Sequence, residues 1–295
     1  MARLLGALAI TIAALLPTST VLATPNAAAD VDVAPAGAAQ IPAGPAPAWI
    51  VADLDSGRIL AGHDQYVTHP PASTIKVLLA LVVLEELPLD ATVVATQADA
   101  TAECNCVGVT AGHVYTTQEL LDGLLLVSGN DAANTLAHML GGTDVAVAKM
   151  NAKALQLGAT GTRAGSPSGL DGPGIDGYTT PHDLAVVFRA ALDNPVFTAI
   201  TSSPTATFPG ADGPVTLYNQ DELLGRYPGM LGGKTGFTDP ARKTFVGAAE
   251  RNGRRLVVAM MYGLVVEGGP TYWDQATGLL DWGFAQDGSA GIGTL

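Results

Sequence analysis

Ser73 and Lys76, in the segment STIK, have the types and the spacing of a nucleophile and its base. Residues three apart in a helix lie on one face, so the lysine amine can reach the serine hydroxyl. A lysine removed from water has a lowered pKa, and its neutral amine can accept the serine proton. Because Pro70 and Pro71 end the preceding chain, we expect Ser73 at a helix N-terminus, where N–H groups stabilise an oxyanion.

Two further short motifs could act with this pair. Ser128 and Asn130, in SGN, fall where one predicted helix ends and another begins. Lys234, Thr235 and Gly236, in KTG, lie on a predicted strand, where a side chain on the glycine would block a substrate from lying along the strand edge. Each motif alone is weak, since Ser and Asn often cap helices and Lys often marks strand edges. All three in this order predict nucleophilic attack on a carbonyl.

The strands that must position these residues lie at the two ends of the chain. Residues 49–64 predict a hairpin around an Asp-Ser-Gly turn, and residues 243–263 predict a second hairpin with Asn252-Gly253 at its tip. The segment LGGKTGFT, residues 231–238, is the expected antiparallel neighbour of the second hairpin. We therefore expect both ends to meet in one sheet.

Helices are predicted between these strand regions. Residues 74–87 are apolar on nearly every side, which is typical of a buried helix. Capping patterns predict helix starts at Thr116 with Glu119, at Thr143, and at Thr180 with Asp183. A helical insert at about 88–205 should pack beside the sheet, with a cleft between them.

Composition excludes some classes of function. The 295 residues carry a formal net charge of -13 with 14 Lys and Arg, so no basic surface for nucleic acid can be assembled. The five His residues are scattered, and we expect neither a metal site nor a cofactor. Cys104 and Cys106 leave a disulfide, which needs a kink at Asn105, and two free thiols as open alternatives.

The two ends of the chain carry further signals. Residues 1–29 combine a basic start, a short apolar run and small-residue exits, which predicts a secretory signal peptide, with an uncleaved anchor as the alternative. Residues 30–47 are predicted to be a Pro/Ala-rich linker, 48–286 the folded domain, and 287–295 a tail. We expect no C-terminal membrane anchor.

The S-x-x-K, S-x-N and K-T-G motifs resemble those of the low-molecular-mass penicillin-binding proteins, which are serine D-alanyl-D-alanine carboxypeptidases of the peptidase S11 type. The resemblance runs from about Trp49 to Phe284 and includes SGNDAAN, SPSGLDGPG and LLDWGF. It implies an α+β, three-layer fold of the β-lactamase/DD-peptidase type, with an antiparallel sheet, helices on both faces and a mainly helical insert. Residues 48–286 would be the DD-peptidase catalytic domain.

The resemblance also implies an activity and its partners. It implies a secreted enzyme of the cell envelope that removes the terminal D-alanine of the peptidoglycan pentapeptide, an acyl-D-Ala-D-Ala peptide. β-Lactam antibiotics such as penicillins would be covalent inhibitors.

Catalytic roles follow from the same resemblance. It implies that Ser73 is the nucleophile and Lys76 its base. Ser128 would relay a proton to the leaving D-alanine, while Asn130 would hold the substrate amide and Lys76.

Substrate-binding roles are also implied. Lys234 would keep Lys76 neutral and attract the terminal carboxylate, to which Thr235 would donate. The backbone N–H groups of Ser73 and Phe237 would form the oxyanion hole, and the absence of a side chain on Gly236 would let the substrate lie along the strand edge. Relatives carry an Arg before the last helix that is absent from GGPTYWDQA here, so the further carboxylate ligand stays open, with Arg242 nearby in sequence.

Several other functions are compatible with the same three motifs. A class A-like β-lactamase needs a Glu midway between the second and third motifs, and Glu222, close to KTG, is the only one present. A β-lactam or peptidoglycan sensor would not need both lysines and both serines. DD-endopeptidase and transpeptidase activities stay open, because they differ only in the leaving amine or the arriving nucleophile.

Overall fold

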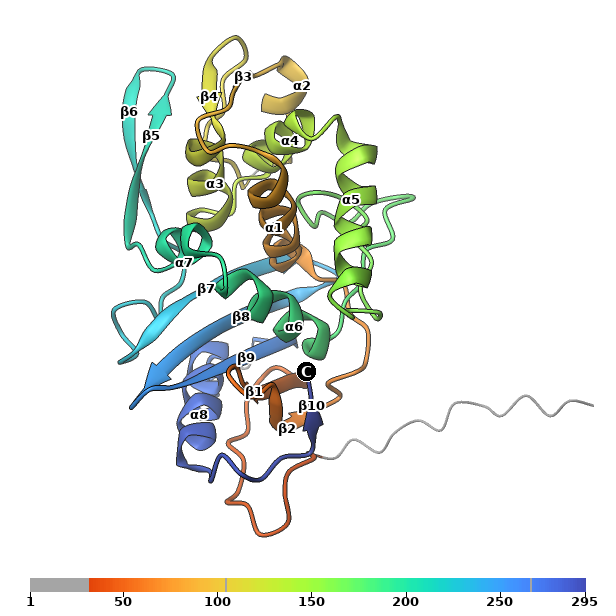
Figure 1. Cartoon of the computed structure of the whole chain (residues 1–295), viewed down its shortest axis with the longest axis vertical. Coiled ribbons are helices and arrows are strands. Elements are labelled where there is room, and N and C mark those ends of the chain that lie inside the picture. The colour runs from red at the N-terminus through yellow and green to blue at the C-terminus, as the bar shows by residue number, and fades with distance from the viewer. Residues whose placement is uncertain (1–31, 104, 266) are drawn as a thin grey trace, which may run out of the picture.

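Strands from both ends of the described chain form one six-stranded sheet (Figure 1). The structure, a computed structural model, describes residues 32–103, 105–265 and 267–295. The sheet order is β10-β2-β1-β9-β8-β7, and every neighbouring pair is antiparallel, as predicted. The strands are β1 (Ala48–Asp53), β2 (Arg58–His63), β7 (Met230–Thr238), β8 (Arg242–Arg251), β9 (Arg254–Gly263) and β10 (Gly293–Thr294).

Alternation along the central strands divides the apolar side chains between two cores. Side chains of a strand point alternately to opposite faces, so a strand buried on both faces must be apolar throughout. In β9, one face places Val257, Ala259 and Met261 in the first core. The other face places Leu256, Val258 and Met260 in the second. The predicted turn at Asn252-Gly253 is confirmed, and both residues adopt positive φ (56° and 77°), as a tight hairpin requires.

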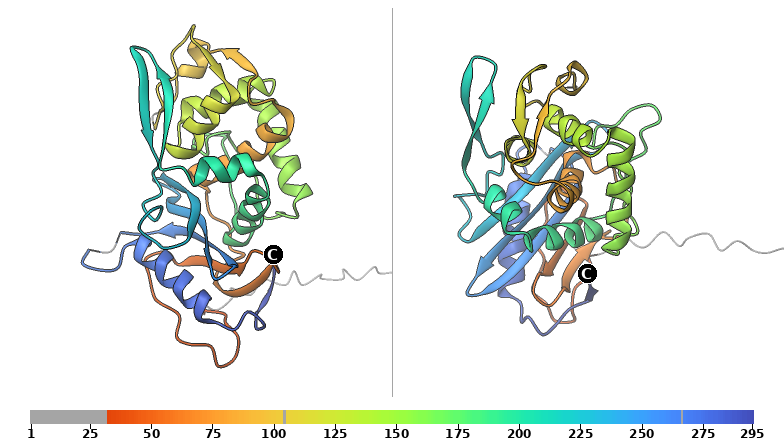
Figure 2. Two further views of the ribbon diagram at one scale, coloured as in Figure 1. Left: turned by 60° about the vertical axis from the view of Figure 1, so that its left-hand side comes forward. Right: turned by 45° about the horizontal axis from the view of Figure 1, so that its top comes forward.

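Helices cover both faces of the sheet, which confirms the predicted α+β layering (Figure 2). α6 (Pro181–Leu192) packs on β1 and β9 from one side, and α8 (Tyr272–Ala285) packs on β1, β8 and β9 from the other. The short helix η1 (Ala72–Ile75) leads into α1 (Lys76–Glu86), whose first eight residues are all buried. The expected buried helix is therefore present, and it begins beside the sheet edge.

The remaining elements stand beside and above the sheet (Figure 1). The helices are α2 (Gln97–Ala100), α3 (Thr117–Leu126), α4 (Asn130–Met139), α5 (Thr143–Gln156) and α7 (Pro195–Thr201). Two further strand pairs are β3 (Thr92–Val94) with β4 (Val114–Thr116), and β5 (Thr205–Gly210) with β6 (Gly213–Tyr218).

The predicted helix starts have different outcomes. The Thr116–Glu119 capping box is confirmed. Thr180 caps α6, but Asp183 does not return the bond, since its carboxylate accepts from Thr162 and contacts His182. The Thr143 cap was wrong, because Thr143 lies inside the first turn of α5, which has no side-chain cap.

The segment 33–47, which composition predicts to be a linker, packs along the sheet and α8. The Gln275 side chain accepts from the N–H of Ala46 at 2.7 Å and donates to its carbonyl at 2.9 Å. Trp282 Nε1 donates to the carbonyl of Ala39 at 2.9 Å. These side chains supply the partners that an irregular segment lacks within itself.

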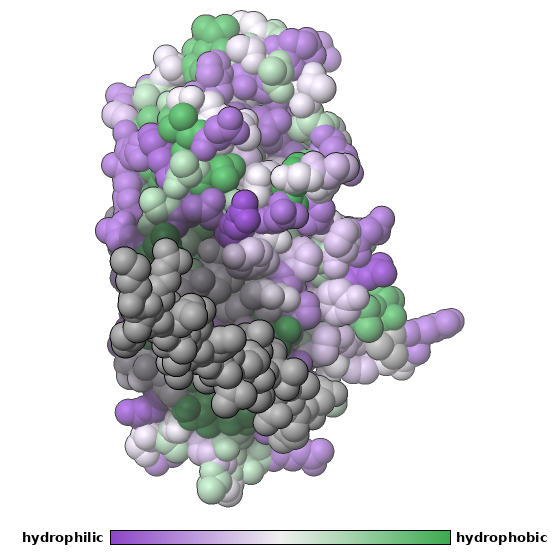
Figure 3. Space-filling view, turned by 90° about the vertical axis from the view of Figure 1, so that its right-hand side faces the viewer, coloured by the Kyte–Doolittle hydropathy of each residue, from purple (hydrophilic) through white to green (hydrophobic). Residues whose placement is uncertain are grey.

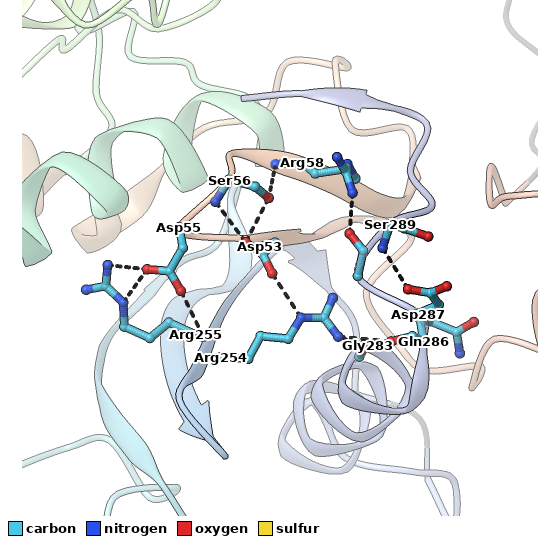
Figure 4. Close-up of polar contacts among 11 residues, drawn as sticks. Asp53, Asp55, Ser56, Arg58, Arg254, Arg255, Gly283, Gln286, Asp287 and Ser289 are labelled. Carbon is cyan, nitrogen blue, oxygen red and sulfur yellow. Dashed lines mark hydrogen bonds and ion pairs between the residues drawn. The ribbon is translucent and has the colours of Figure 1, made fainter.

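The predicted tail also joins the fold. β10 pairs with β2, and the side chain of Arg58 donates to the carbonyl of Gly288. Arg254 donates to Asp53 at 2.9 Å and to the carbonyls of Gly283 and Gln286 at 3.2 and 3.0 Å (Figure 4). One arginine thus joins the first strand to the C-terminal end of α8.

Some predictions fall on or beside residues that are not described. The predicted signal peptide, residues 1–29, and Cys104 lie outside the described residues, whereas Cys106 is disulfide-bonded. No single described helix is long and apolar enough to span a membrane; α6 and α7 pass only as a pair bent by 107°. On the part of the surface that Figure 3 leaves open, hydrophobic residues form small separate groups among hydrophilic ones.

Candidate active site

A cleft of about 740 Å³ lies along β7, between that strand, the turn before α4 and the loop at residues 169–172. The structure brings all eight predicted site residues together at it. Lys76 and Lys234 are buried at 0% and 1% exposure. The other six line the cleft, namely Ser73, Ser128, Asn130, Thr235, Gly236 and Phe237.

The amine of Lys76 is the centre of the polar network. Its Nζ lies 2.7 Å from Ser73 Oγ, 2.8 Å from the carbonyl oxygen of Ser128 and 2.6 Å from Asn130 Oδ1. The hydroxyl of Ser128 is 3.3 Å away. A neutral amine has two N–H donors and one lone pair, and the two carbonyl oxygens can only accept. They can take both N–H groups, which leaves the lone pair for a serine hydroxyl.

Burial favours the neutral form of this amine. Loss of water lowers the pKa of Lys76 well below its usual value, and the nearby charge of Lys234 lowers it further. The carboxylate of Asp131 opposes these two effects. The buried lysine at the start of α1 is thus held where it can serve as a base.

Ser73 lies in η1, one turn before Lys76, where the chain is held tightly. Ala72 adopts a positive φ of 47°, which is uncommon for a residue with a side chain. A side-chain carbon on Gly169 would lie 1.9 Å from the carbonyl oxygen of Ala72, so only glycine allows this approach. The Ser73 hydroxyl lies 3.4 Å from the carbonyl of Ser168. The loop therefore packs directly against the turn that carries the hydroxyl.

The turn between α3 and α4 presents the second motif. Ser128 adopts a φ of 62°, and the Asn130 amide donates to the carbonyl of Glu103 at 2.6 Å. Asp131 is 1% exposed, and its carboxylate accepts the N–H groups of residues 107, 108 and 109 at 2.8–2.9 Å. This carboxylate fixes the loop that closes one wall of the cleft.

The third motif lies on β7, one of the two edge strands of the sheet. Lys234 Nζ donates to the carbonyl of Thr235 at 2.8 Å. A side-chain carbon on Gly236 would lie 2.9 Å from Ser73 N and 2.4 Å from Thr244 Oγ1. Glycine is needed here because η1 approaches the strand, in addition to the predicted need for substrate space. Thr244 Oγ1 donates to the carbonyl of Pro71 at 3.0 Å and so ties β8 to the same turn.

Sequence reasoning missed the residues that support the motifs. These residues are Asp131, Thr244 and Asp221. Asp131 carried a sequence signal, because it directly follows Asn130 and an acidic residue is common in the first turn of a helix. Arg242, considered as a carboxylate ligand, is not among the cleft-lining residues, whereas Lys243 is.

Comparison with known proteins identifies the family that this site belongs to. A family model described as D-alanyl-D-alanine carboxypeptidase matches residues 35–263. The chain belongs to the D-alanyl-D-alanine carboxypeptidase family, peptidase S11. It is a serine-type carboxypeptidase, a hydrolase, which confirms the class that its motifs predicted.

Relatives of this carboxypeptidase share both sequence and fold. It is 70% identical over 267 residues to D-alanyl-D-alanine carboxypeptidase DacB2 of Mycobacterium tuberculosis, covering 90% of this chain and 92% of that one. A solved D-alanyl-D-alanine carboxypeptidase from the same organism superimposes with a TM-score of 0.88 at 70% identity, over 89% of this chain and all of that one. The Streptomyces K15 DD-transpeptidase matches with a TM-score of 0.78 at 28% identity, over 84% and 100% of the two chains.

Proposed function

We propose that this carboxypeptidase removes the terminal D-alanine of peptidoglycan stem peptides through an acyl-enzyme on Ser73. Lys76 Nζ, 2.7 Å from Ser73 Oγ, accepts the hydroxyl proton as the oxygen bonds to the peptide carbonyl carbon. The carbonyl oxygen becomes an oxyanion, which the N–H groups of Ser73 and Phe237 stabilise. Such a donor is worth about 3–4 kcal/mol in comparable enzymes. The observation that carries the proposal is the fully buried amine of Lys76, whose pKa burial lowers, lying 2.7 Å from this hydroxyl.

Ser128 completes the first half of the reaction in this proposal. Its hydroxyl, 3.3 Å from Lys76 Nζ, gives its proton to the leaving nitrogen as the C–N bond breaks, and regains one from Lys76. D-Alanine departs, with Lys234 and Thr235 holding its carboxylate. Water then adds to the ester carbon, and the ester bond to Ser73 breaks to regenerate the hydroxyl.

Penicillins would acylate the same hydroxyl in place of the peptide. The contacts of Glu222 argue for slow release of the resulting ester, unlike in a β-lactamase. Its carboxylate pairs with Arg226 at 2.8 Å and is 57% exposed, so it is poorly suited to activate water beside Ser73. Export into the cell envelope, suggested by residues 1–29, is part of the same proposal.

The test is covalent labelling with a fluorescent penicillin, followed by an assay of D-alanine release from an acyl-D-Ala-D-Ala peptide. We expect the wild type to be labelled on Ser73 and to release D-alanine. Ser73→Ala should lose both activities while keeping its fold. Ser202→Ala serves as the matched control, because Ser202 is exposed at the end of α7 and does not line the cleft. Equal labelling of wild type and Ser73→Ala would remove the nucleophile from the proposal.

A further inference from the structure

A buried carboxylate stands behind the third motif and has no role in the reaction described so far. Asp221 is 3% exposed, and its Oδ2 has no hydrogen-bond partner among the described residues. A carboxylate removed from water without a partner is costly, so it needs a compensating charge. The fully buried Lys234 is the cation within its electrostatic reach.

The local chain conformation directs Asp221 inward. Its neighbours Gln220 and Glu222 both line the cleft, whereas Asp221 is buried and does not line it. The N–H of Gln220 donates to the carbonyl of Leu126 at 3.0 Å, which joins this segment to the end of α3, just before the second motif. The N–H of Asp221 donates to Asn219 Oδ1, and its Oδ1 accepts from Leu223 N, both at 2.9 Å. The carboxylate is therefore held in place by backbone contacts.

The two buried charges act on each other without a direct ion pair. Burial lowers the pKa of Lys234 to about 7, and the Asp221 carboxylate opposes that fall. Burial raises the pKa of Asp221 to about 6, and the charge of Glu222 also raises it. Backbone hydrogen bonds from Leu223 and Leu224 and the charge of Lys234 oppose this rise. Among the described residues, Lys234 Nζ makes one hydrogen bond, to the carbonyl of Thr235.

Other charged groups face this pair from the packed elements. Lys76 on α1 is affected by Lys234 and by Asp131 on α4. Tyr272 on α8 keeps its proton, because burial raises its pKa and Glu222 and Asp221 raise it further. Asp221 is thus the buried anion that acts directly on Lys234.

We propose that Asp221 is the counter-ion of Lys234, a positioning residue that keeps this lysine an ammonium ion while the cleft is empty. The inference rests on the proposed function, in which the Lys234 ammonium receives the terminal carboxylate of the substrate. Substrate binding then brings a second anion to a cation that Asp221 has already kept charged. Asp221 makes no contact with the substrate and acts only through Lys234.

The proposal predicts which limb of the pH profile depends on Asp221. Activity needs Lys76 neutral and Lys234 charged, so kcat/KM should rise and then fall with pH. Removal of an anion makes loss of a proton from the nearby cation easier. Asp221→Asn should therefore move the alkaline limb to lower pH by about one unit or more, and leave the acid limb nearly in place. Near neutral pH the loss should appear mainly as a raised KM, because carboxylate binding is weakened.

The experiment is a pH profile of kcat and KM for an acyl-D-Ala-D-Ala peptide, with the fold of each variant checked by circular dichroism. Asp221→Glu, which restores the charge, should recover most of the alkaline limb. Asp122→Asn is the matched control, since burial raises the pKa of that carboxyl to about 6 as well, but its neighbours are Gln118 and Glu119. Both limbs should stay in place in the control.

The outcomes separate this inference from the proposed function. A wild type that neither binds penicillin nor releases D-alanine would overturn the function itself. An active wild type whose profile is unchanged by Asp221→Asn would overturn only the role of Asp221.

A measurement on the wild type covers the case in which Asp221→Asn does not fold. Carbon-13 signals of the Asp221 carboxyl and the Lys234 Cε should show the same two titration steps, because coupled groups share macroscopic pKa values. Independent single steps would contradict the proposal.

Discussion

At the scale of single residues, the site depends on amines and carboxylates kept out of water. The sequence motifs and the family resemblance named eight site residues, and the structure brings all eight together at the cleft, with six of them in its lining. The motifs could not reveal Asp131, whose carboxylate accepts from a loop far from it in the chain, or Asp221, whose burial depends on the tertiary fold. Nor could they reveal the positive φ of Ser128, which lies in the turn between the packed helices α3 and α4.

Lys76→Met tests the cost of burying this amine. A lysine whose folded pKa is depressed binds fewer protons in the folded state than in the unfolded state, so its cost falls as pH rises towards the unfolded value of 10.5. The Met variant lacks this cost. Its free energy of unfolding, relative to wild type, should therefore improve as pH falls from about 9 to about 6, by up to about 1.4 kcal/mol per pH unit.

Urea unfolding at several pH values measures this difference. The hydrogen bonds lost with the amine lower stability equally at each pH, so the slope isolates the charge. Lys149→Met, which removes a partly exposed lysine paired with Glu86, is the control and should show no comparable slope. A constant difference between Lys76→Met and wild type would contradict a depressed pKa.

At the scale of elements, the long alternating and apolar patterns predicted their strands and helix, whereas the cap expected at Thr143 was wrong. The 243–263 hairpin and the buried helix were predicted because alternation, the Asn-Gly turn and the apolar run are local. The β5–β6 hairpin was missed, since Pro209 and Pro214 argue against strands. In the structure these two prolines lie opposite each other near its tip, where no further strand has to pair.

Thr244→Val tests the tether between β8 and the turn that carries Ser73. The valine keeps the shape but cannot donate to the carbonyl of Pro71, so we expect a loss of about 1–2 kcal/mol in stability. Because the tether holds η1 against β7, acylation by penicillin should also slow, by roughly tenfold. Stopped-flow acylation and urea unfolding measure the two effects, with Thr207→Val on the exposed β5 as control. Reduced stability with unchanged acylation would make the bond purely structural.

At the scale of the whole molecule, segments that composition marks as linker and tail complete the fold. Residues 33–47 and 287–295 have no periodicity, so sequence alone gives no element for them. Their structure comes from partners elsewhere, such as Gln275 and Trp282 for the first and Arg58 for the second.

Two adjacent arginines allow a direct test of how the end of α8 is held to the first strand (Figure 4). Arg254→Met should cost about 2–3 kcal/mol, because a partly buried charge on Asp53 and two carbonyls lose their donor. Arg255→Met breaks a more exposed pair with Asp55 and should cost less than about 1 kcal/mol. Neither arginine lines the cleft, so penicillin acylation should be unchanged in both. Equal losses of stability in the two variants would contradict the role given to Arg254.

Pairing of β10 with β2 affects which edge of the sheet can accept a further strand from another molecule. A bare sheet edge presents free N–H and C=O groups, to which any extended chain can add as a further strand. β10 shields part of the β2 edge, whereas β7, at the opposite end of the sheet order, stays open along the cleft. A peptide that adds to β7 as a further strand would therefore lie beside Ser73, and two copies of the protein have less opportunity to join through β2.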